Sequence, residues 1–139
     1  KYTKIEIIEI NDYDLDIIIE HCLSSYKNIF SEEKILLIIE ALLECGADVN
    51  YIEYERDFNF LQYALNNDYS KEFNLKLLDI LIKYNINLNN KDRWGDTFFD
   101  DLYRRNTIKL NQITPIYKKL VNNGFDIFRT DTNYYNYGS

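Results

Sequence analysis

The feature that most constrains this 139-residue chain is a nine-residue segment that occurs three times at equal spacing. The copies read LLECGADVN, LIKYNINLN and LVNNGFDIF. Gly46, Asn85 and Gly124 hold the same place in the three copies, so the two intervals between them are equal. A period of this size, about 39 residues, indicates supersecondary units that stack side by side and bury a common core.

Each copy of the segment ends a run of apolar residues with helical spacing, for example Ile35, Ile39 and Leu42 before Gly46. Glycine or asparagine at the stop is typical of a helix that ends in the left-handed conformation, because both tolerate a positive φ. A second apolar run with helical spacing precedes each of these helices, and no segment has the pattern of a central strand. We therefore expect an all-α fold of about three helix pairs.

The period divides the chain into three expected units within one domain. These units cover 14–50, 51–89 and 90–128, with 1–13 as an N-terminal cap and 129–139 as a C-terminal tail. Loops of about eight residues join the pairs and are expected to project sideways.

Three residues predict where individual helices begin. Ser31 is an expected N-cap for the helix that runs to Cys45, and Thr97 for the helix that starts at Phe98. Pro115 is the only proline, and it fits the first turn of the last helix, where a missing N–H costs nothing.

The charge of the chain limits its partners. The formal net charge is −7, which repels nucleic-acid phosphates and anionic membrane surfaces and favours a basic protein partner. The longest apolar runs are too short to span a bilayer, and the first residues lack the pattern of a signal peptide. We expect a monomeric, cytoplasmic protein that binds neither nucleic acid nor membranes.

The chain shows no motif for a metal, a cofactor or a catalytic group. Cys22 and Cys45 lie in apolar helical runs and are expected to be reduced, buried thiols. His21 beside Cys22 has no second Cys/His pair to complete a zinc site. Asp100 and Asp101 are a carboxylate pair, but neighbours on a helix diverge and no nucleophile or phosphate loop accompanies them. We therefore expect neither enzymatic activity nor a cofactor.

The stretch 88–102, LNNKDRWGDTFFDDL, resembles the ankyrin repeat. Asn89, Asp92, Gly95 and Thr97 match the family pattern that leads into its T-P-L-H-x-A motif. The chain departs from the family in its longer period, where the family has about 33 residues, and in the absence of the Pro-His pair. The resemblance implies an ankyrin-like solenoid with projecting finger loops.

Ankyrin-like stacks generally bind proteins with their finger loops and inner helices. By position, the resemblance assigns partner binding to Tyr51, Glu53, Tyr54, Glu55, Arg56, Asp57, Lys91, Arg93, Trp94, Asp96 and Arg129. Trp94 is the only tryptophan, and tryptophan is frequent among interface hot spots. The same side chain could instead fold back over the neighbouring finger, and the sequence leaves both interpretations open.

The leading functional hypothesis is a protein-binding module, and within it an immunity or antitoxin-type antagonist of a basic protein. One alternative is a capping fragment or effector domain of a larger ankyrin protein, which predicts an exposed apolar end. Another is a small hydrolase or transferase with scattered carboxylates, which predicts a deep pocket that holds carboxylates of perturbed pKa.

Overall fold

The computed structural model describes residues 12–104 and 110–126, with side chains from 15–104 and 115–126. These residues form six α-helices, one 3₁₀ helix and no strand, which confirms the all-α prediction. The elements are α2 (Asp12–Ser24), η1 (Ser25–Asn28), α3 (Glu32–Glu44), α4 (Phe60–Leu65), α5 (Lys71–Lys83), α6 (Phe98–Arg104) and α7 (Leu110–Asn122). The expected tail and nearly all of the expected N-terminal cap lie outside the described residues.

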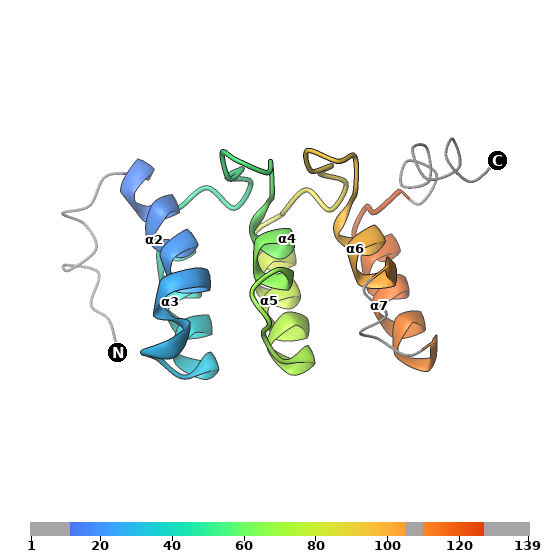
Figure 1. The fold of residues 1–139 in the computed structure, drawn as a ribbon, viewed down its shortest axis with the longest axis horizontal. Helices are drawn as coiled ribbons and strands as arrows, with labels where there is room; N and C mark the ends of the chain where they lie inside the picture. Colours follow the sequence, from blue (N-terminus) through green and yellow to red (C-terminus); the bar gives the residue numbers. More distant parts are fainter. Residues whose placement is uncertain (1–11, 105–109, 127–139) are drawn as a thin grey trace.

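The helices lie in three pairs, α2 with α3, α4 with α5, and α6 with α7, placed side by side along the longest axis (Figure 1). Helix α4 contacts both α2 and α6, and α3 contacts α5. The two loops that join one pair to the next project from the same edge (Figure 1). We name them finger 1 (residues 51–58) and finger 2 (residues 91–97).

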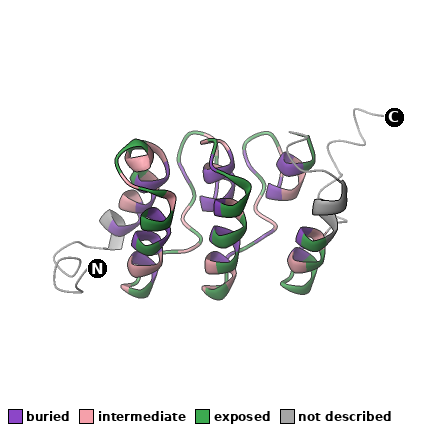
Figure 2. Cartoon of the chain, turned by 90° about the horizontal axis from the view of Figure 1, so that it is seen from below, coloured by how far each residue is buried: buried purple, intermediate pink, exposed green. Residues whose placement is uncertain are grey.

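The apolar residues with helical spacing form the core. Ile35, Ile39 and Leu42 of α3 are buried, as the spacing predicts, and so are Leu77 and Leu81 of α5. The buried residues line the contacts within and between the pairs, and the outward faces are exposed (Figure 2). Among the residues that the structure describes, none of the helices has the length and apolar character that crossing a bilayer requires.

The predicted helix ends at the three similar segments are confirmed. Gly46, Asn85 and Gly124 have φ angles of 107°, 67° and 98°, in the left-handed region. In each segment, the N–H that follows this residue donates to the carbonyl of the segment's first leucine, at 3.1, 3.1 and 2.9 Å. This bond reverses the chain so that the residue after the cap returns its side chain to the core.

The N-cap predictions are confirmed as well, whereas the predicted position of Pro115 is wrong. Ser31 Oγ accepts a hydrogen bond from the N–H of Lys34 at 3.2 Å, and Thr97 Oγ1 accepts one from the N–H of Asp100 at 3.3 Å. Helix α7 begins at Leu110, five residues before the proline, so Pro115 lies inside the helix. The residues before the proline, which include Leu110 and Ile113, therefore belong to the helix as well.

The two thiols differ in burial. Both cysteines are free, and Cys22 is buried as expected, with burial raising the pKa of its thiol to about 12. Cys45 is only partly buried, which corrects the prediction. Cys45 is less buried because it caps the C-terminus of α3, where the chain turns away from the core.

Asparagine side chains join neighbouring helix pairs at equivalent places in the chain. Asn50 Oδ1 accepts a hydrogen bond from the N–H of Asn87 at 2.7 Å, and Asn89 Oδ1 accepts one from the N–H of Asp126, also at 2.7 Å. Asn50 and Asn89 are separated by one period of the sequence. Each bond fixes the base of one finger against the next helix pair, so the two fingers start from equivalent places.

Candidate protein-binding surface

Finger 1 is folded around the carboxylate of Glu53. Its two oxygens accept hydrogen bonds from the N–H groups of Glu55 (2.8 Å) and Arg56 (3.0 Å). The N–H of Glu53 donates to the carbonyl of Phe58 at 2.8 Å and closes the loop, while Asp57 has a φ of 58°. Glu53 is only 6% exposed, and this predicted contact residue holds the loop in shape.

Finger 2 is folded around Asp92 in the same way. Asp92 Oδ1 accepts hydrogen bonds from the N–H groups of Trp94 (2.9 Å) and Asp96 (3.0 Å), and the N–H of Asp92 closes the loop on the Asp96 carbonyl at 2.8 Å. Gly95, with φ of 84°, takes the left-handed position. Burial raises the pKa of the Asp92 carboxyl, and the two N–H donors oppose this shift.

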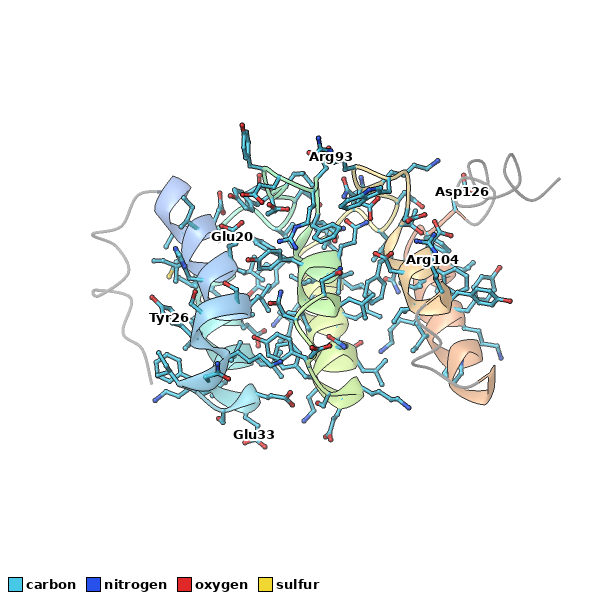
Figure 3. All side chains as sticks on the ribbon, in the orientation of Figure 1. Glu20, Tyr26, Glu33, Arg93, Arg104 and Asp126 are labelled. Atoms are coloured by element: carbon cyan, nitrogen blue, oxygen red, sulfur yellow. The ribbon has the colours of Figure 1, made fainter. Side chains whose placement is uncertain are left out.

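The fingers are bonded to each other. The N–H of Arg93 donates to the carbonyl of Arg56 at 2.8 Å, and its guanidinium donates to the carbonyl of Glu55 at 3.2 Å. The side chain of Asn90 donates to the carbonyl of Asp57 at 3.0 Å. Arg93 lies at the outer edge where the two loops meet (Figure 3). The two loops therefore form one preorganised surface.

Gln62 of α4 fixes this surface to the helices. Its Nε2 donates to the carbonyls of Asn90 (3.2 Å) and Asp96 (2.9 Å), and its Oε1 accepts from the side chain of Asn90 at 2.8 Å. Gln62 also forms a capping box with Asn59 at the start of α4. Gln62 is fully buried, and both its amide oxygen and its amide nitrogen form hydrogen bonds, as buried polar atoms generally do.

Two aromatic side chains project from the fingers into solvent. Tyr54 is 91% exposed and Trp94 is 60% exposed. The Trp94 ring also lies 6.2 Å from the ring of Phe58, centroid to centroid, so this tryptophan folds partly back over the neighbouring finger while most of its surface stays exposed. Tyr51 is different, because its ring stacks on Phe60 of α4 at 5.6 Å and packs against the core.

Charged residues surround the two aromatics. Glu55, Asp57, Lys91 and Arg93 are exposed. Arg56 is drawn inward: its guanidinium lies 4.9 Å from the Phe58 ring centroid and contacts Glu53 at 3.5 Å. Arg129 lies outside the described residues.

Three carboxylates meet at the base of finger 2, a grouping that the sequence did not reveal. Oxygens of Asp92, Asp96 and Asp101 lie within 4.8 Å of one another, a donor set that a divalent cation can accept. Arg104 supplies positive charge here, with hydrogen bonds of 2.7 and 2.8 Å to the two oxygens of Asp96 (Figure 3). Asp100 turns away and caps α6 at Thr97, so the neighbouring aspartates diverge as expected.

Comparison of the chain with family models, with curated proteins and with solved structures finds no match. A function for this protein therefore has to be inferred from the contacts described above. They bring ten of the eleven sequence-predicted contact residues onto two adjacent loops, where some are exposed and others hold the loops together. The hydrogen-bonding role of Glu53 and Asp92 was missed, although these two acids are separated by exactly one period of the sequence.

Proposed function

We propose that this protein is a divergent ankyrin-like solenoid that binds another protein through its two fingers. The proposal within that class is an immunity-type antagonist that blocks a basic protein. Three features support the solenoid: helix pairs in a row, left-handed caps at the sequence period, and asparagine bonds that recur with the same period. Repeating units of this kind present their loops as a continuous binding surface.

The observation that carries the binding proposal is the pair of aromatic side chains held in solvent by rigid loops. Tyr54 and Trp94 are 91% and 60% exposed, and backbone bonds between the fingers fix the distance between their loops. Exposed large aromatic side chains on an ordered loop lower the entropy lost on binding, and tyrosine and tryptophan are frequent hot spots.

The distribution of charge supports a basic partner and indicates how it is oriented. Residues 14–50 contain eight acidic and two basic residues, while residues 90–128 contain five acidic and seven basic ones. The acidic excess therefore lies toward the N-terminal end. A basic protein approaches this end faster than the other, because complementary potentials steer the encounter.

The experiment is capture of partners from native lysate, followed by affinity measurement with the purified partner. Tyr54→Ala and Trp94→Ala are each expected to weaken binding at least tenfold, whereas Val121→Ala is expected to leave it unchanged. Val121 is the matched control because it is an apolar residue, 41% exposed, on α7 and outside the two fingers. Equal affinity of all four proteins for the partner would contradict the proposal.

A further inference from the structure

A second surface lies away from the fingers, in a groove between α3 and α5. The groove has a volume of about 280 Å³ and is lined by Glu33, Leu36, Leu37, Glu40, Lys76 and Ile80. Glu33, at its end on α3, lies at the opposite edge of the molecule from Arg93 at the finger tips (Figure 3). The groove and the fingers are therefore separate surfaces.

Three of the lining residues are apolar and three are charged, and one of the apolar side chains is unusually exposed. Leu37 is 67% exposed, whereas the other leucines and isoleucines of α3 are buried. Leu36 and Ile80 line the groove beside it. Covering an exposed leucine removes apolar surface from water, so a partner that covers Leu37 binds more tightly.

The two helices that form the groove carry a small acidic excess. Helix α3 carries four glutamates and one lysine, whereas α5 has three lysines and two acidic residues. Glu40 pairs with Lys83 at 2.9 Å and Lys76 pairs with Glu72 at 3.3 Å, so these lysines are already engaged. Glu33 forms no ion pair with another described residue.

The size of the groove indicates what fits. On α3 the lining residues run from Glu33 to Glu40, which is about 10 Å along a helix. Sites for drug-sized ligands start at roughly 300 Å³, so this groove accepts one or two aliphatic side chains rather than a large ligand. Two leucines about two helical turns apart match that length.

We propose that the α3–α5 groove is a second docking surface, which binds a basic amphipathic helix of a partner protein. Leucine or isoleucine side chains of that helix enter the groove beside Leu37, and its lysines or arginines face Glu33 and the other glutamates of α3. A second copy of this chain fits poorly, because a symmetric contact would place two acidic α3 helices against each other.

The test uses a fluorescein-labelled helical peptide of leucine and lysine, about 18 residues long, with all its leucines on one face. Fluorescence anisotropy measures its Kd for the full chain and for two variants, Leu37→Asp and Val121→Asp. Each variant adds one negative charge at an exposed apolar helix residue, 67% exposed at Leu37 and 41% at Val121, so the added charge is the same and its place differs. We expect Leu37→Asp to weaken binding about tenfold or more, and Val121→Asp to change the Kd by less than about twofold.

Two further readouts separate the groove from other surfaces. A peptide of the same composition without an apolar face is expected to bind at least about tenfold more weakly. If charge alone caused binding, the two peptides would bind equally. Trp94, the only tryptophan, reports on the fingers, and its emission is expected to stay unchanged on binding. Equal affinity for both Asp variants would overturn the proposal. A dimer of the free protein that Leu37→Asp abolishes would assign the groove to self-association and also overturn it.

Discussion

The two fingers share one design and differ in size. In each, a buried carboxylate accepts backbone N–H groups and its own N–H closes the loop. Finger 1 closes from Glu53 to Phe58, and finger 2 closes from Asp92 to Asp96, one residue less. The longer loop has the longer acid, because glutamate carries one methylene more than aspartate. The reach of the carboxylate therefore matches the length of the loop.

The fingers also differ in what their aromatic side chains do. Tyr54 stands clear of finger 1, while Trp94 of finger 2 lies over Phe58 of the other finger. Under the proposed function, a side chain that covers a neighbour serves both stability and binding, whereas a fully solvated one serves binding only. The comparison therefore predicts which substitutions affect folding and which affect only the partner.

The largest effect is expected from removing either carboxylate. Glu53→Ala and Asp92→Ala each leave two N–H groups without their acceptor, and each is expected to lower the free energy of unfolding by about 1–3 kcal/mol. Urea denaturation measures this change. Asp92→Asn is the matched control because Oδ1 alone accepts both bonds and the amide keeps one acceptor oxygen, and a loss as large as that of Asp92→Ala would contradict the acceptor role.

A smaller effect is expected from exchanging the acid lengths. Glu53→Asp shortens the reach in the longer loop, and Asp92→Glu overfills the shorter one. Each is expected to cost about 1 kcal/mol of unfolding free energy, the contribution of a typical hydrogen bond. The double exchange keeps the composition constant. If either single variant is as stable as the wild type, the match between acid and loop length is not a requirement.

The two aromatic residues are expected to separate stability from binding. Trp94→Ala removes the contact with Phe58 and is expected to lower the free energy of unfolding by about 1 kcal/mol. Tyr54→Ala is expected to change it by less than about 0.5 kcal/mol, because the side chain is almost fully solvated. Thermal unfolding of both variants measures the difference, and equal loss of stability would show that Tyr54 also packs on the fold.

The smallest effect concerns Glu20 of α2, which lies near finger 1 (Figure 3). Burial, and then the charge of Glu53, raise the pKa of its carboxyl above the ordinary 4.5. A raised folded-state pKa means that the stability from this group is present in full below pH 4.5 and is lost as pH rises through the folded-state pKa. Glu20→Gln is therefore expected to be slightly more stable than wild type at pH 7.

The matching measurement is urea denaturation of both proteins as pH falls from 7 toward 4.5. The advantage of Glu20→Gln is expected to shrink, since protonation makes Glu20 neutral in the wild type as well. Asp96 of finger 2 is the contrasting carboxylate because Arg104 binds both of its oxygens, so Asp96→Asn is expected to be less stable than wild type at pH 7. An advantage of Glu20→Gln that is independent of pH would rule out the electrostatic cause.

Local rules were sufficient to predict the helix pairs and most of the helix ends. Apolar spacing marked the core of α3, and the tolerance of Gly46 and Asn85 for positive φ marked the caps, because these effects involve residues a few positions apart. Pro115 misled the prediction of α7, since proline is common in a first turn and also occurs within a helix whose packing tolerates the lost bond.

The interior of the fingers could not be predicted from such rules. Exposed acidic residues and a structural carboxylate look alike in a polar loop, so Glu53 was assigned to partner contact although it is buried. The bond from Arg93 to Arg56 joins residues that only the stacking of helix pairs brings together. The proximity of Asp92 to Asp101 similarly depends on how finger 2 returns to α6.

The asparagine bonds at the bases of the fingers have a consequence for how the protein can change. Asn50 and Asn89 anchor each loop to the next helix pair before the loop departs, and Gln62 anchors finger 2 to α4. Residues can therefore be inserted or replaced near Tyr54 or Trp94 while the scaffold keeps its alignment. Under the proposed function, new partner specificities can evolve, or be engineered, through changes at the finger tips that leave the helix pairs unaltered.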